Sequence, residues 1–115
     1  GLLILTTPNA QGFDVATLGL QSGNFDQEHL NYFNPSSLSN LVEACGLEVL
    51  EVQTPGQLDV DLVRNAVHQG RCDLSHQPFL QSVIVDRFEE LGKSFQEYLS
   101  DHCMSSHLWI VARKR

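Results

Sequence analysis

Both ends of the chain carry a short segment that is apolar on both faces of a strand. The first, residues 1–7, has the sequence GLLILTT and is followed by the turn formers Pro8 and Asn9. The second, residues 106–113, has the sequence SHLWIVAR. A strand without a polar face is typical of the interior of an α/β sheet, where both faces are covered. The two segments are therefore predicted to be interior strands, with His107 as a buried core histidine.

The strongest helix signal lies over residues 35–45. Asn34 is a favoured N-cap, Pro35 suits the first helical position, and Gly46 suits the position just after a helix. Apolar residues follow helical spacing along one side of this segment, and they are Leu38, Leu41, Val42 and Cys45. This stripe predicts that one face of the helix is buried and that Cys45 is a small core residue.

Residues 47–54 are predicted to form a third strand, which follows the helix directly. The order strand, loop, helix, strand is typical of a right-handed crossover between parallel strands. Further helices are predicted over residues 59–69, 77–91 and 95–101, with the last two joined as one helix kinked near Gly92. Residues 8–35 are rich in turn formers and aromatic side chains. The one regular element predicted within them is a short helix near residues 14–20.

The length of 115 residues suits one domain, and charge is distributed unevenly along it. The net charge is −7, and residues 1–63 contain no Lys or Arg. Because an acidic half repels phosphate, the sequence argues against nucleic-acid binding. The longest aliphatic run, residues 2–5, falls far short of the roughly 20 residues that span a bilayer, and the sequence does not begin with a signal-peptide pattern. Three cysteines without a CxxC pair indicate reduced thiols in a cytoplasmic protein.

Three potential metal ligands, His68, Cys72 and His76, recur at four-residue spacing. Gly70 argues against one continuous helix through them, and no second cluster completes a four-ligand site. No metal site is therefore predicted.

Three motifs occur in a characteristic order along the chain. A strand ends in Thr7-Pro8-Asn9, residues 28–38 have the sequence EHLNYFNPSSL, and the following helix ends at Gly46 before a new strand. Together with the final strand, this order resembles the C-terminal half of a class I S-adenosylmethionine-dependent methyltransferase. The sequence departs from the family pattern in having Leu47 where the family usually has Phe.

The resemblance implies a fold. Family members have a Rossmann-like, seven-stranded and mostly parallel sheet, in which the antiparallel seventh strand lies between the fifth and the sixth. For this chain it implies an α/β structure with a three-stranded mixed sheet packed with three to four helices. The strand from Leu2 to Thr7 would be parallel to residues 48–53, with residues 107–113 between them. Residues 1–115 would then be the C-terminal portion of one methyltransferase-like domain.

The resemblance also implies S-adenosylmethionine as the cofactor of a complete enzyme. The family holds that cofactor with a Gly-rich turn after the first strand and with an acidic residue at the end of the second. The chain contains neither motif and has no G-x-G sequence. It is therefore expected to be the acceptor side of such an enzyme without the cofactor-binding half, and to be inactive in isolation.

The loop after the first strand would border the acceptor pocket, since ligands of α/β sheets collect beyond the carboxyl ends of parallel strands. His29 is the candidate general base, because histidine titrates near neutral pH; the alternative is a histidine that fixes the loop. Candidate acceptor-binding residues are Asn9, Asp14, Tyr32 and Phe33. The alternatives are a turn residue for Asn9, a solvated loop acid for Asp14, and core packing for Phe33.

Two functions follow from this sequence. The first is methyl transfer to a small-molecule or carrier-linked acceptor by the complete enzyme, with no nucleic-acid or membrane partner. The second is a binding or assembly module that uses the α/β portion as a scaffold. In that case the strand from Leu2 to Thr7 would be an exposed apolar edge through which chains self-associate.

Overall fold

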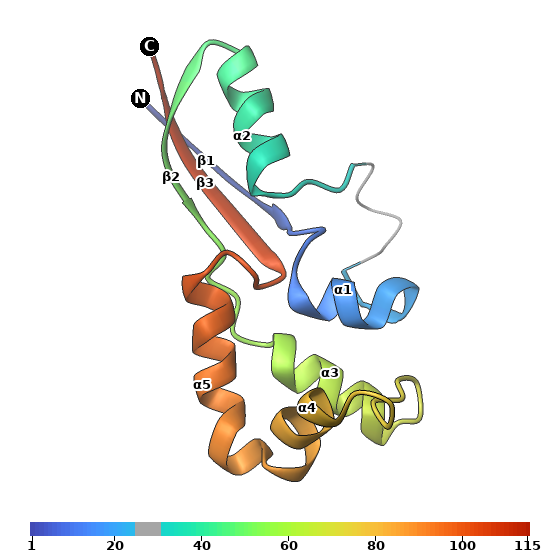
Figure 1. Ribbon diagram of the computed structural model, residues 1–115. Helices are drawn as coiled ribbons and strands as arrows, with labels where there is room; N and C mark the ends of the chain where they lie inside the picture. Colours follow the sequence, from blue (N-terminus) through green and yellow to red (C-terminus); the bar gives the residue numbers. More distant parts are fainter. Residues whose placement is uncertain (25–30) are drawn as a thin grey trace.

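The computed structural model describes residues 1–24 and 31–115 (Figure 1). Its three strands are β1 (Leu2–Pro8), β2 (Leu47–Gln53) and β3 (His107–Lys114). They form one sheet in the order β1-β3-β2, so the last strand lies between the other two. The α/β class and the predicted strand order are confirmed.

Both strand pairs in the sheet are antiparallel. Leu2 pairs with Arg113 and Pro8 with His107, whereas Leu47 pairs with Lys114 on the other side of β3. Strands β1 and β2 run in the same direction but do not pair with each other. The predicted mixed sheet is therefore not confirmed, because the strand inserted between the two parallel ones makes every ladder antiparallel.

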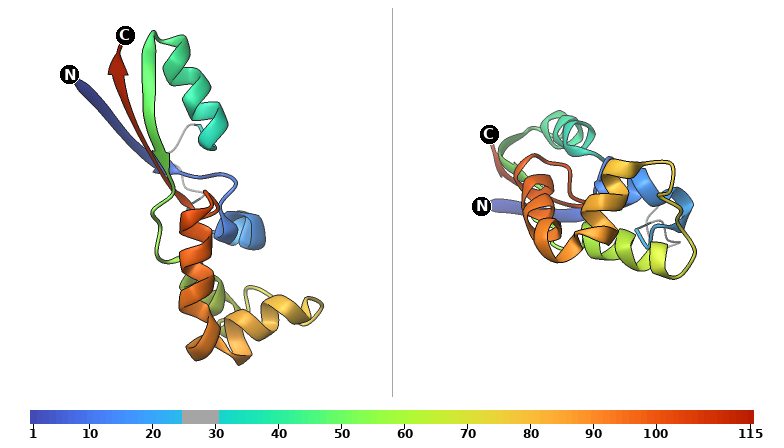
Figure 2. Two further views of the ribbon diagram at one scale, coloured as in Figure 1. Left: turned by 60° about the vertical axis from the view of Figure 1, so that its left-hand side comes forward. Right: turned by 60° about the horizontal axis from the view of Figure 1, so that its bottom comes forward.

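Helix α2 (Pro35–Ala44) covers one face of the sheet (Figure 2). Its N-terminus forms a capping box, in which the Asn34 side chain accepts from the Ser37 backbone N–H and the Ser37 hydroxyl oxygen accepts from the Asn34 backbone N–H. The residues buried between α2 and the sheet are Leu38, Val42, Leu108, Ile110 and Ala112. Local capping and the apolar stripe therefore place α2 where the sequence predicts it.

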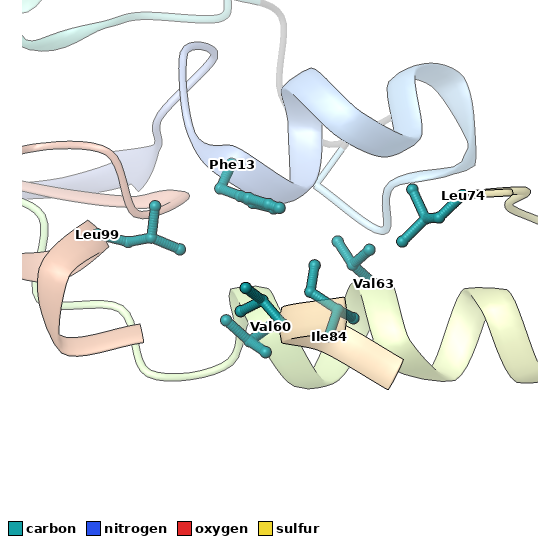
Figure 3. Close-up of a cluster of buried hydrophobic side chains, with 7 residues drawn as sticks. Phe13, Val60, Val63, Leu74, Ile84 and Leu99 are labelled. Atoms are coloured by element: carbon teal, nitrogen blue, oxygen red, sulfur yellow. The ribbon is translucent and has the colours of Figure 1, made fainter. Parts of the chain in front are cut away.

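The other helices lie beyond the end of the sheet at which β1 and β2 stop (Figure 1). They are α1 (Phe13–Leu18), the 3₁₀ turn η1 (Gly19–Gln21), α3 (Asp59–His68), α4 (Pro78–Gln81), the π-helical turn η2 (Ser82–Asp86) and α5 (Phe88–Asp101). They enclose a second apolar cluster of Phe13, Val60, Val63, Leu74, Val83, Ile84 and Leu99, most of which Figure 3 labels. The molecule thus has a sheet core and a helical core.

Five α-helices in the described residues exceed the three to four predicted, because the segment expected as one helix over residues 77–91 is divided. It consists of α4, the π-helical turn and the first turn of α5. Gly92 does not break α5. A Cβ atom at Gly92 would lie 2.7 Å from the Phe88 ring, so glycine here permits close packing within the helix.

Three predictions about burial are wrong. Strand β1 lies at the edge of the described sheet, and Leu2 and Ile4, on the face away from α2, are 65% and 57% exposed. Cys45 is exposed because it is the C-cap, where the chain leaves the helical path of the stripe. His107 is exposed at the first position of β3, although Leu108, Ile110 and Ala112 confirm that β3 itself is interior.

None of the helices in residues 1–24 and 31–115 has the length and apolar character needed to span a membrane.

Candidate functional site

A pocket of about 350 Å³ lies at the end of the sheet where β1 and β2 stop and β3 begins. Its walls come from the turn before α3, from the start of β3 and from the segment after α1. The lining residues are Asn24, Gly56, Gln57, Leu58, Asp59, Leu62, Ser106 and His107. The volume suits a small molecule, and the position matches the edge at which α/β sheets bind ligands.

The wall of this pocket is built on Asp59, in the first turn of α3. Its carboxylate accepts hydrogen bonds from the Ser105 hydroxyl at 2.6 Å, the Ser106 hydroxyl at 2.6 Å and the Ser106 backbone N–H at 3.0 Å. It also accepts from the backbone N–H of Asp14 at 3.2 Å. Asp59 therefore joins the first turn of α1, the start of α3 and the segment leading into β3.

A second carboxyl group, that of Asp14, lies on the other side of Ser106. The Ser106 hydroxyl is hydrogen-bonded to Asp14 Oδ1, while Asp14 Oδ2 accepts from Ser22 Oγ at 3.0 Å and Asn24 Nδ2 at 2.9 Å. Asp14 is completely buried. Burial raises the pKa of the Asp14 carboxyl, and the nearby Asp59 charge raises it further. Asp14, Ser106 and Asp59 are named here the Asp–Ser–Asp cluster.

Helix α5 supports the cluster through Gln96, which is buried. Its side-chain oxygen accepts from the backbone N–H of Val60 at 2.9 Å, and its amide nitrogen donates to the Gly56 carbonyl at 3.0 Å and to Asp59 Oδ1 at 3.3 Å. Two glycines make room for the serines. A Cβ atom would lie 2.2 Å from Ser106 Oγ at Gly12 and 2.0 Å from Ser105 Oγ at Gly56.

The candidate acceptor-binding residues occupy different positions around this site. Asp14 belongs to the Asp–Ser–Asp cluster, so it is a buried helix residue, and the alternative of a solvated loop acid is wrong. Asn9 is fully buried, and its amide donates to the Ser105 carbonyl at 2.8 Å. Phe33 packs against the sheet core, while Tyr32 is 37% exposed. His29, the candidate general base, lies outside the described residues, so its catalytic role stays a prediction, as do the acceptor-binding roles of the other four residues.

Asp59, Ser106 and His107 are site residues that the sequence patterns do not predict. A signal was available for Asp59, which opens a predicted helix just after a predicted strand, at the edge where ligands collect. For Ser106 no local signal existed, because its importance depends on two helix N-termini that meet only in the folded chain.

The described residues do not fit S-adenosylmethionine. The glycine that follows β1, Gly12, brings the backbone close to Ser106 and not to an open cradle. The carboxyl groups of Asp14 and Asp59, which lie at this end of the sheet, are engaged by donors from the chain itself. Residues 1–24 and 31–115 also contain no cluster of three metal-ligating side chains.

No family model, curated protein or solved structure matches the chain.

Proposed function

We propose that the chain is the acceptor side of an S-adenosylmethionine-dependent methyltransferase, a transferase whose cofactor-binding half lies outside these 115 residues. The observation that supports this most directly is the strand order β1-β3-β2, with the antiparallel final strand inserted between two parallel ones. The motif resemblance implies that order, and nothing in the local strand patterns alone requires it.

The pocket at the ends of β1 and β2 is the proposed acceptor site. Leu58 and Leu62 offer apolar contacts, and the amide groups of Asn24 and Gln57 and the imidazole of His107 offer hydrogen bonds. This lining suits a small molecule, or the exposed end of a carrier-linked one, with both an apolar body and polar groups. In methyl transfer the protein contributes largely by aligning the acceptor, so a shaped pocket is the part expected here.

The first test of this proposal is calorimetric titration of the 115-residue chain with S-adenosylmethionine and S-adenosylhomocysteine. We expect no saturable binding, because the described residues contain no cradle for the cofactor. Tight binding would contradict the assignment of the chain to the acceptor side.

The second test is the reading frame upstream of Gly1. A strand followed by a Gly-rich turn, in a protein that transfers labelled methyl groups, is the expected result, and a frame without them argues against the proposal.

A second candidate function is self-association through β1. The free edge of this strand is apolar and has no charged side chain, and such edges favour pairing with another chain. Leu2 and Ile4 extend the apolar surface onto the face that α2 does not cover. These features support a dimer in which two β1 strands pair and the sheets become continuous.

The dimer is tested by replacing Ile4 with lysine, because a lysine on an edge strand opposes edge-to-edge pairing. Sedimentation equilibrium should show a dimer for the original chain and at least a tenfold weaker association for Ile4→Lys. The control is Leu20→Lys. Leu20 is also an exposed apolar residue, but it belongs to η1 and not to the sheet. A monomeric original chain at high micromolar concentration would contradict the assembly function.

A further inference from the structure

The hydroxyl group of Ser106 lies between two carboxyl oxygens. It is hydrogen-bonded to Asp14 Oδ1 on one side and to Asp59 Oδ2, at 2.6 Å, on the other. A serine hydroxyl has a single proton, so it donates only one hydrogen bond at a time. If both carboxyl groups were ionised, one of the two contacts would bring lone pairs together. The geometry therefore requires a second proton, carried by one of the two aspartates.

The surroundings of Asp59 favour its negative form. Its two oxygens accept from two serine hydroxyls, two backbone N–H groups and the amide of Gln96. It also lies in the first turn of the ten-residue helix α3, where the helix dipole favours negative charge. Both oxygens of Asp59 already face donor hydrogens, so an additional proton on either oxygen would meet a donor.

The surroundings of Asp14 differ at one oxygen. Oδ2 accepts from Ser22 and Asn24, and the backbone of Val15 also hydrogen-bonds this carboxyl group, whereas Oδ1 faces the Ser106 hydroxyl. A proton on Oδ1 would donate to Ser106 Oγ, which then uses its own proton for Asp59. Every contact of the Asp–Ser–Asp cluster then has one donor and one acceptor.

The charged groups near Asp14 do not compensate a second negative charge. Helix α1 and the turn η1 contain no other ionisable side chain. On α3 the first turn adds only Asp61, while Arg64 lies over the Phe88 ring at 4.1 Å and His68 is at the far end. His107, at the start of β3, is exposed at the pocket. Among the described residues, the charge that acts on Asp14 is that of Asp59.

We propose that Asp14 is a neutral carboxylic acid at neutral pH, and that its Oδ1 proton donates to Ser106 Oγ, which in turn donates to ionised Asp59. These two consecutive hydrogen bonds connect α1 to the start of β3 and to α3. Asp14 is then a positioning residue for the pocket wall, since Ser106 and Asp59 line the pocket and Asp14 does not. The proposal concerns a proton and does not depend on methyl transfer.

The proton on Asp14 makes the stability of the folded chain depend on pH. The raised pKa of Asp14 means that the folded chain binds a proton that the unfolded chain releases above about pH 4. Stability from this group is therefore fully present below the unfolded pKa and falls as the pH rises through the folded pKa. For one proton the equilibrium constant of folding changes by at most tenfold per pH unit in that window.

The test compares Asp14→Asn with Asp59→Asn by urea denaturation between about pH 5 and about pH 8. Asparagine at position 14 reproduces the neutral acid, because its amide donates to Ser106 and its oxygen accepts from Ser22 and Asn24. Asp14→Asn should fold at least as stably as the original chain at the upper pH and should lose the decline with pH. Asparagine at position 59 would place an NH₂ group, which cannot accept a hydrogen bond, opposite donors that now bind a carboxylate oxygen. Asp59→Asn should therefore lower the equilibrium constant of folding at every pH by at least tenfold.

The proposal is overturned if Asp14→Asn is as destabilised as Asp59→Asn and keeps the original pH dependence. Should Asp59→Asn not fold, the unaltered chain still decides the question. With ¹³C-labelled aspartate, the carboxyl signal of Asp14 should keep the shift of a protonated acid at pH values where the exposed aspartates show ionised shifts. An ionised Asp14 signal at neutral pH would contradict the shared proton.

Discussion

Replacing Asp59 with alanine is expected to lower the free energy of unfolding by about 3–5 kcal/mol, because it removes one acceptor shared by several buried hydrogen-bond donors. The substitution leaves the Ser105 hydroxyl and the backbone N–H groups of Asp14 and Ser106 without their acceptor, while the Ser106 hydroxyl keeps only Asp14 Oδ1. Each buried donor left unsatisfied costs roughly 1–3 kcal/mol, so even partial rescue by water leaves a large deficit. Because whole domains are stable by only about 5–15 kcal/mol, the variant should be close to unfolding at room temperature.

The matched control is Asp61→Ala on the same helix. Asp61 also lies in the first turn of α3, so it shares the helix dipole, but it is half-buried and its carboxylate has no hydrogen-bond partner among the described residues. Its loss should cost less than about 1 kcal/mol. Urea denaturation followed by far-UV circular dichroism measures both variants. Equal effects at the two positions would show that the network around Asp59 contributes nothing beyond the dipole.

The elements that the sequence predicts well are those whose signals are local. Helix α2 has its N-cap, its proline and its closing glycine within a dozen residues, and its boundaries agree with the prediction to within one residue. The strand β3 is predicted as interior because it has no polar face, and its central residues are buried. The position of β3 between β1 and β2 is not a local property, and it was predicted from the motif resemblance alone.

The candidate site was harder to predict because it depends on helix ends that are far apart in sequence. Asp14 and Asp59 are 45 residues apart, and Ser106 is a further 47 residues along the chain. Nothing near Asp14 in the sequence distinguishes a buried acid from a solvated one. Periodicity also fails at the ends of elements, which is why Cys45 and His107 were expected to be buried and are exposed.

Truncating an isoleucine in either apolar core should have the next largest effect. Ile110 in the sheet core and Ile84 in the helical core are both completely buried, and Figure 3 shows Ile84 directed toward Val63 of α3. Replacing either with alanine should cost about 2–5 kcal/mol, since buried methyl groups are removed and a cavity remains. The control is Leu20→Ala, because Leu20 is 89% exposed and its loss should change stability by less than about 0.5 kcal/mol.

The same two variants test whether the cores unfold together. The Asp–Ser–Asp cluster joins them, because Ser106 leads directly into β3 while Asp59 and Asp14 begin the helices that line the helical core. Trp109, the single tryptophan, lies on β3 and reports on the sheet by fluorescence, whereas circular dichroism reports mainly on the helices. We expect both probes to give one coincident transition in Ile84→Ala and in Ile110→Ala. A sheet transition that stays unchanged in Ile84→Ala would mean that the buried cluster does not couple the two cores.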